Sequence, residues 1–508
     1  MRALIMRFLK PLFYIIVFIL AANQPARAAL NEKLIQRGVD LTLNMRFEQA
    51  IALFDSLIRE YPQDPAGYFL KSAVYFWMYT QDVRMADVAE QFEKISDQGI
   101  EAAEKQLEKN EEDLDAKFFL GAIYGNLGRY YIMNSSWIKA YWYGKEGKDL
   151  LEEIVEADPE YYNAYLGLGI YHYYADILPG VIKMLSYILG IEGDKKKGLE
   201  ELKLAISKGS FVKSEARFFL AMTYMYFEYN YLRARDLWAK LARAYPENTF
   251  FILSQARCEM YMNDYPAALQ LYKKALARKD ARLKFAMNRA HYFVGQIYFK
   301  MNRFGEAVEH YKLAVKNIPP KDGKRHWIYA WGMVHLGESY EMLGNRAKAE
   351  QCYRDVAGKE EIYAYMQGAV KNARQRLQNP LTWFDKQLIY ARNYRETQKL
   401  DSALVVLNRL KEEIDSGRYV DKKNEFFYNL GLVYLKKGRT SEAIALFKKI
   451  LAEQPEEPDW LLPYTHYQIG NAYLRLNKKE AARAHYERAG ESDNPRLRIQ
   501  VNRALDHL

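Results

Sequence analysis

The stretch NRAHYFVGQIYFKMNRFGEAVEHYKLAVKNIPPK, residues 288–321, decides how this chain folds. Apolar residues recur in it at spacings of three and four, which predicts two amphipathic helices joined by a short turn. Gly295 and Ala307 are small where the two helices would approach closely, and Tyr298 and Tyr311 would fill the space beside them. One hairpin cannot bury its own apolar face, so further hairpins must stack on it.

The six informative positions of this stretch are a small residue at position 8, an aromatic at 11, Ala at 20, an aromatic at 24, Ala at 27 and Pro at 32. This pattern resembles the tetratricopeptide repeat (TPR), which has a period of about 34 residues. Clear further copies have their small residue at Gly38, Ala221, Ala256, Gly337, Gly431 and Gly470. With weaker copies they predict an all-α, TPR-like α-solenoid of about eleven helical hairpins wound into a superhelix. Each repeat would contact only its neighbours, and we expect no β-sheet.

The N-terminus predicts export. Residues 1–28 combine a basic start, the apolar run Leu12 to Ala22 and the A-x-A sequence Ala26-Arg27-Ala28, which together are typical of a signal peptide cleaved after Ala28. We expect a periplasmic protein, with an uncleaved N-terminal anchor as the alternative. Residues 29–378 would form an N-terminal TPR solenoid with aromatic and apolar insertions. Residues 379–508 would form C-terminal TPR repeats, since Asn379-Pro380 favours a boundary.

Composition argues against several functions. The net charge of +10 includes four basic residues in 1–28, leaving 10 − 4 = +6 on the mature chain. Lys and Arg are interleaved with Asp and Glu instead of forming a basic face, so nucleic-acid binding is not expected. Of the 508 residues only two are cysteines, Cys258 and Cys352, which we expect to be small apolar fillers.

No catalytic motif is present. The run from Gly193 to Gly198 lacks the Lys and hydroxyl residue of a phosphate-binding loop, and the eight histidines show no metal-ligand spacing. Asp158, Glu160, His172 and Asp176 are close in sequence and could suggest acid–base chemistry, but polar helix positions explain them equally well. The sequence therefore predicts no enzyme, no cofactor and no metal.

In the TPR family, defined positions of each repeat's first helix line a concave groove. The resemblance therefore implies a partner-binding set: Arg289, Tyr292, Gln296, Lys300, Asn429, Lys436, Gln468, Asn471 and Arg475. Some TPR domains hold a peptide's C-terminal carboxylate with Lys, Asn and Arg at such positions. Amides would satisfy a peptide backbone and cations would pair with a carboxylate. The alternative is that these polar residues simply face water.

Two segments depart from the repeat pattern. Aromatic residues are dense at Tyr130–Tyr143 and Tyr161–Tyr174, and Ile177–Ile191 is an apolar run. We expect both to be buried; exposed, the rings would stack on sugars or anchor a partner, and the apolar run would contact a membrane surface. The sequence LPGVIKMLSYILGIEGD followed by KKKGLEELKLA makes residues 160–250 resemble the tetratricopeptide repeat protein 39 family.

The functional prediction is an exported TPR scaffold that binds a protein or peptide partner, as a peptide or helix in its concave groove. The alternative is an envelope protein that binds glycan or lipid through the insertions at 130–143 and 177–191, with peripheral membrane contact. The sequence leaves the partner and the oligomeric state open.

Overall fold

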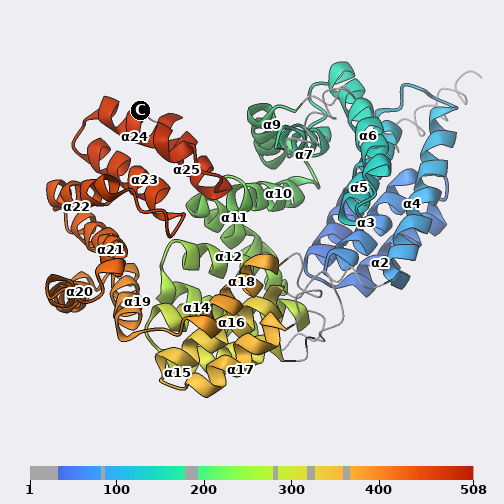
Figure 1. Cartoon of the computed structure of the whole chain (residues 1–508). Coiled ribbons are helices and arrows are strands. Elements are labelled where there is room, and N and C mark those ends of the chain that lie inside the picture. Colours follow the sequence, from blue (N-terminus) through green and yellow to red (C-terminus); the bar gives the residue numbers. More distant parts are fainter. Residues whose placement is uncertain are drawn as a thin grey trace, which may run out of the picture. The chain divides into compact units, whose positions relative to one another are not determined.

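The computed structural model describes residues 32–81, 86–177, 193–278, 284–316, 318, 327–358, 366–506 and 508. In these ranges the chain consists of consecutive helices joined by turns and loops, without a strand (Figure 1). The predicted all-α solenoid is confirmed. The expected signal peptide (1–28), Pro319 and all of the Ile177–Ile191 run after Ile177 lie outside the described residues. None of the described helices has the length and apolar character needed to cross a bilayer.

The chain divides into two compact units, Met1–Gln255 and Ala256–Leu508, and the division falls inside α12 (Thr249–Tyr261). The predicted boundary at Asn379-Pro380 lies within the second unit and stays a prediction. The helices of the first unit are α2 (Phe47–Glu60), α3 (Pro65–Gln81), α4 (Ala86–Leu107), α5 (Leu114–Met133), α6 (Trp137–Ala157), α7 (Ala164–Asp176), α9 (Lys195–Lys208), α10 (Lys213–Tyr226) and α11 (Tyr231–Ala244).

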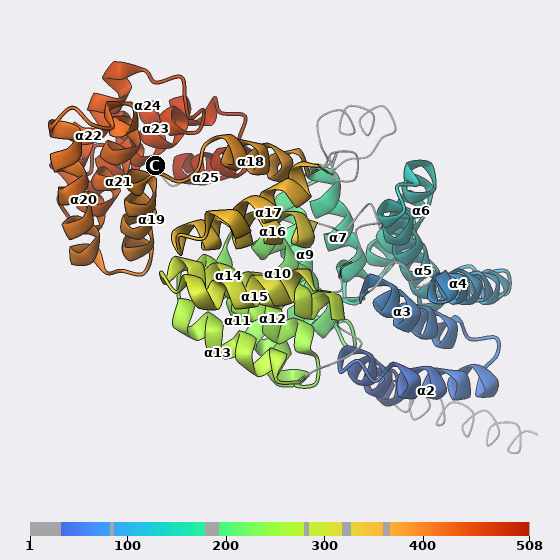
Figure 2. The ribbon, with the colours of Figure 1, turned by 60° about the horizontal axis from the view of Figure 1, so that its bottom comes forward.

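The second unit continues the series of hairpins, and Figure 2 shows α19 to α24 following one another as packed neighbours. Its helices are α13 (Tyr265–Leu276), α14 (Lys284–Lys300), α15 (Phe304–Val315), α16 (Trp327–Met342), α17 (Arg346–Ala357), α18 (Gln367–Gln378), α19 (Trp383–Glu396), α20 (Leu400–Asp415), α21 (Lys423–Lys436), α22 (Thr440–Glu453), α23 (Leu461–Arg475), α24 (Lys479–Gly490) and α25 (Pro495–Asp506).

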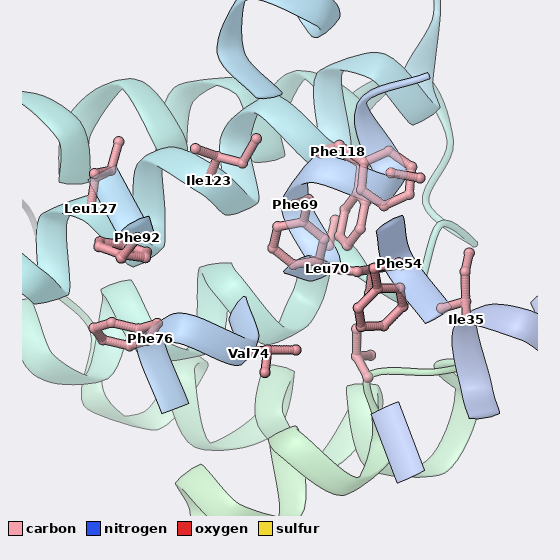
Figure 3. Packing of buried hydrophobic residues seen from close by; sticks show 14 of the residues in the cluster. Ile35, Phe54, Phe69, Leu70, Val74, Phe76, Phe92, Phe118, Ile123 and Leu127 are labelled. Carbon is pink, nitrogen blue, oxygen red and sulfur yellow. The ribbon is translucent and has the colours of Figure 1, made fainter. Parts of the chain in front are cut away.

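A continuous apolar core runs through the first unit, with buried residues from Ile35 to Ala216 (Figure 3). Aromatic rings make up much of it: Phe69 and Phe119 lie 5.7 Å apart between centroids, and Phe76 and Phe92 lie 5.3 Å apart. Stacked hairpins therefore share one core, as the amphipathic pattern predicts.

The packing inside a hairpin confirms the role given to Gly295. A Cβ added there would lie 2.8 Å from the ring of Tyr311, whose side chain is fully buried. The same small-residue and aromatic pairing recurs at Gly337 and Tyr353, Gly431 and Phe447, and Gly470 and Tyr486. These contacts bring the two helices of each hairpin close together.

The turn between the two helices has a constant backbone feature. Asn302 adopts φ 60°, in the left-handed region that favours Asn and Gly. The equivalent position is also left-handed in eight other hairpins, at Met45, Ser135, Tyr229, Asn263, Gly344, Gln398, Gly438 and Asn477. These residues end the first helix and redirect the chain into the second.

The expectation that each repeat contacts only its neighbours is wrong. In the second unit, Asn393 Nδ2 donates to the Phe299 carbonyl at 2.8 Å, across 94 residues. In the first unit, Asn248 Nδ2 donates to the Leu43 carbonyl at 2.8 Å, across 205 residues. Each unit therefore curves enough to bring sequence-distant hairpins together.

Candidate partner-binding surface

The first four predicted partner-binding residues lie on α14. Tyr292 is only 5% exposed; its ring packs edge-on against Trp327, and its hydroxyl accepts a hydrogen bond from Gln296 Nε2 at 3.0 Å. Burial lowers the pKa of Arg289, which lies near Tyr272. Little of Tyr292 is thus left for a partner, whereas Gln296 and Lys300 keep part of their surface exposed.

Lys300, the last residue of α14, pairs with Glu396, the last residue of α19: Nζ and Oε2 are 2.7 Å apart. Arg392 and Arg395 flank the same carboxylate. Burial alone would raise the pKa of Glu396, but the charges of Lys300, Arg392 and Arg395 together lower it. Burial lowers the pKa of Lys300, and the neighbouring Arg392 lowers it further.

Lys436 brings a fourth cation to this place. Its Nζ donates to the Arg395 carbonyl at 3.2 Å, at the end of α19. Asn429 accepts a hydrogen bond from Arg395 Nη1 at 3.0 Å and donates to the Glu425 carbonyl. We call Lys300, Arg392, Arg395, Lys436 and Glu396 the basic cluster.

The basic cluster carries four positive charges and one negative charge. Arg392 Nε is buried and has no hydrogen-bond partner among the described residues. The side chain of Lys436 is exposed, but neighbouring atoms partly desolvate its charged form and lower its pKa, and nearby Arg395 adds repulsion. A carboxylate brought to this place would relieve that repulsion and form charge-assisted hydrogen bonds.

The predicted residues of α23 are largely engaged within the protein. Asn471 accepts from the Tyr486 hydroxyl at 2.8 Å and donates to Gln468 Oε1 at 3.3 Å. Arg475 donates to the Leu435 carbonyl, as Lys436 does to the Arg395 carbonyl. Each of these two cations thereby donates to a carbonyl at the C-terminus of the first helix in the preceding repeat, where the helix dipole favours positive charge.

The aromatic insertions are only partly buried, so the expectation of burial is half right. Tyr130 and Tyr173 lie in the core, and Tyr131 stacks on Tyr143 at 5.5 Å between centroids. Trp137 and Trp142, in contrast, are 53% and 58% exposed. They belong to an exposed group at the α5–α6 turn that we call the apolar tip: Ile132, Met133, Trp137, Ile138 and Trp142. The sequence shows that aromatic residues are dense here, but it does not show which rings are exposed to solvent.

The residues considered for acid–base chemistry have separate partners. His172 Nδ1 lies 2.7 Å from Glu201 Oε2, and both side chains are buried. Asp158 accepts a hydrogen bond from the Glu160 N–H at the start of a turn. Glu201 was not singled out by the sequence, because it reads as one of several polar positions on α9.

Two histidine pairs were also missed by sequence reasoning. The Nδ1 atoms of His291 and His310 are 3.1 Å apart, and those of His466 and His485 are 3.0 Å apart. In both pairs the partners are 19 residues apart and occupy the same two repeat positions. That repeated spacing was a signal available in the sequence.

The comparison with known families decides the identity of the repeats. The tetratricopeptide repeat family matches residues 253–322 and residues 425–491. The chain contains tetratricopeptide repeats in these two stretches. The two matched stretches include α14–α15 and α21–α24, the helices that carry the histidine pairs and part of the basic cluster. The two cysteines, Cys258 and Cys352, are buried and form no disulfide among the described residues, as expected for small apolar fillers.

Several solved structures are distantly similar to this chain. RapI in its apo form is 15% identical, with 86% of this chain and 98% of that chain covered and a TM-score of 0.41. A tetratricopeptide repeat protein from Parabacteroides merdae is 14% identical, with 57% and 98% covered and a TM-score of 0.26. Yeast Tom70 is 12% identical, with 91% and 90% covered and a TM-score of 0.30. No curated protein matches the sequence.

Proposed function

We propose that this protein is an exported scaffold that binds an acidic segment of a protein partner along the first helices of its second unit. TPR repeats generally bind proteins, and the observation that supports an acidic partner is the basic cluster. Lys300, Arg392 and Arg395 surround Glu396 there, and Lys436 lies beside them at the Arg395 carbonyl. Arg392 Nε is left without a hydrogen-bond partner among the described residues. A partner carboxylate at this place would complete the charge balance that Glu396 begins.

Binding would use parts of the surface that are already ordered. Lys300 and Arg395 are held by Glu396, and Lys436 by the Arg395 carbonyl, so their charges are positioned before a partner arrives. Because preorganised side chains lose little entropy on binding, a short acidic peptide would suffice. The predicted groove residues Gln468, Asn471 and Arg475 would extend the contact along the neighbouring repeat.

Fluorescence anisotropy with labelled acidic peptides tests this proposal. Glu-rich peptides should bind, and affinity should fall as salt rises, because exposed charges are screened. The exposed Lys436 can be changed to Gln without opening a core, and we expect this to weaken binding about tenfold, the size of a charge-assisted hydrogen bond. Lys411→Gln, an exposed cation of α20 paired with Asp415, is the matched control. Equal affinity for Lys436→Gln and wild type would refute the assignment.

The exported location is tested separately. The intact mass of the protein from a cell-envelope fraction should correspond to a chain that begins at Ala29. A mature chain that begins at Met1 in the cytoplasmic fraction would refute it, whatever the peptide-binding result.

The apolar tip supports a second candidate function, contact with a membrane surface. Ile138 is 76% exposed beside Trp137 and Trp142, and Lys139 is the charged residue among them. Trp rings and aliphatic side chains at a protrusion favour the headgroup boundary of a bilayer. In liposome flotation the protein should rise with vesicles, and Ile138→Ser with Trp142→Ser should abolish this. Val405→Ser, an exposed aliphatic residue on α20, is the control; flotation that survives loss of the tip would refute the idea.

A further inference from the structure

The two histidine pairs use half of the histidines in the protein. The chain has eight, and four of them form the pairs His291–His310 and His466–His485. In each pair the first histidine lies on the first helix of its hairpin (α14 or α23) and the second on the helix that follows (α15 or α24). Tyr298 packs on His310 and Tyr473 on His485, at 5.3 and 5.6 Å between centroids, so the surroundings repeat as well.

The hairpin does not need histidine at these positions. In two other repeats of the second unit the same positions, again 19 residues apart, carry Met333 with Cys352 and Phe427 with Leu446. All four of those side chains are buried or pack against buried clusters. Replacing an apolar pair with two imidazoles exchanges apolar burial for a single hydrogen bond, so packing alone does not explain the histidines.

The distances match two ligands of one metal ion. Imidazole nitrogens bind Zn²⁺ at about 2.0–2.1 Å, so nitrogens 3.0–3.1 Å apart would subtend an angle of about 95–100° at the ion. That angle lies between the square and tetrahedral values, which transition metals accept. We propose that each pair is a two-imidazole site for a divalent transition-metal ion such as Zn²⁺, Ni²⁺ or Cu²⁺, which clips together the two helices of its hairpin.

The pairs are also open to solvent. All four side chains remain partly exposed, which gives a hydrated ion access.

The two sites differ in their surrounding charge. The His291–His310 pair has Lys273 and Glu309 nearby, one charge of each sign. The His466–His485 pair has Lys448, Arg488 and Glu491 nearby, an excess of one positive charge. We therefore expect the first pair to bind a divalent ion more tightly. Among the described residues no group of three or more His, Cys, Asp and Glu side chains could hold a metal, so water would fill the remaining coordination positions.

Titration of the untagged, EDTA-stripped protein with Ni²⁺ against a chromophoric chelator tests the proposal. His310→Gln should remove one bound equivalent and His310→Gln with His485→Gln should remove two. His335→Gln, which breaks the His335–Glu338 pair outside the two sites, should remove none. A second double variant, His291→Phe with His310→Leu, should also lose one bound equivalent. It places at these positions the residues of the Phe427–Leu446 pair, which another hairpin of this protein already accommodates.

Thermal unfolding gives a second readout that a merely structural role would not produce. Ni²⁺ or Zn²⁺ should raise the melting temperature of the wild type but not that of the double variant, because a ligand stabilises the state that binds it. Equal numbers of bound equivalents in wild type and double variant would overturn the proposal. So would a wild type that binds no Ni²⁺ across the whole titration.

Discussion

Adding one methyl group at Gly295 tests how the hairpins pack. The Cβ of Gly295→Ala would lie 2.8 and 2.9 Å from two ring carbons of Tyr311, closer than real Cβ atoms come to their neighbours. The ring has little room to move away, because Tyr311 is fully buried and packs against Tyr292 and His335. Gly305→Ala, ten residues on in the same repeat, is the matched control, because nothing lies within 4 Å of its Cβ.

The two variants share the gain in helix propensity but not the steric cost. Replacing Gly by Ala within a helix stabilises by about 0.5–1 kcal/mol, and Gly305→Ala, near the start of α15, should show up to that gain. Overpacking a core costs about 1–3 kcal/mol, so Gly295→Ala should be less stable than Gly305→Ala by roughly that amount. In a unit of this size, a change of 1 kcal/mol in the free energy of unfolding shifts the melting temperature by about 2–4 °C. The two variants should therefore differ in melting temperature by about 2–12 °C.

Circular dichroism at the helical minimum, followed on heating and in urea, would measure both variants. Gly295→Leu extends the series and should lower the melting temperature further. Equal melting temperatures for Gly295→Ala and Gly305→Ala would show that Tyr311 does not lie against Gly295. The two helices of the hairpin would then not pack through this pair of residues.

Three further predictions concern the second unit. Asn393→Ala should lower the free energy of unfolding by about 1–3 kcal/mol, because the buried Phe299 carbonyl loses its donor; urea titration measures this. The pKa of Glu396 is lower in the folded than in the unfolded state, so its contribution is present above pH 4.5 and is lost as pH falls. Urea titrations from pH 6 to 3 should therefore show a steeper loss for wild type than for Glu396→Gln. Burial raises the pKa of the Cys352 thiol to about 11, so a disulfide reagent at pH 8 should react with it only after unfolding.

The repeat positions could be predicted because local geometry dictates them. A hairpin with two close helices requires a small residue opposite an aromatic one, and Gly295 with Tyr311 shows this in sequence and structure alike. The left-handed turn residue, Asn302 and its equivalents, obeys an equally local rule, although the pattern of six positions does not include it. Short-range constraints of this kind leave a periodic trace in the sequence.

The candidate site was less predictable, because a lysine or arginine at a given repeat position can either face a partner or bind another part of the protein. Lys436 and Arg475 occupy positions that line the groove in the TPR family, yet each donates to a carbonyl at the end of the preceding repeat's first helix. Arg392 and Arg395 were not chosen from the sequence. Their repeat matches the TPR pattern poorly, so its residues could not be assigned to groove positions. Only the spatial arrangement shows that they share Glu396 with Lys300.

Contacts between distant hairpins could not be predicted at all, and they change how the array should unfold. The repeat pattern does not mark Asn393, but the residue is fully buried, and its amide donates to the Phe299 carbonyl and to Asn302 Oδ1 at the end of α14. An array with contacts between neighbours alone would unfold hairpin by hairpin, and a break in its middle would leave the flanks folded. Here α14 and α19 support each other across the hairpins between them, with Lys300 and Glu396 adding an ion pair at the same junction. We therefore expect the α14–α15 hairpin and α19 to gain and lose hydrogen-exchange protection together, which an array of independent repeats would not do.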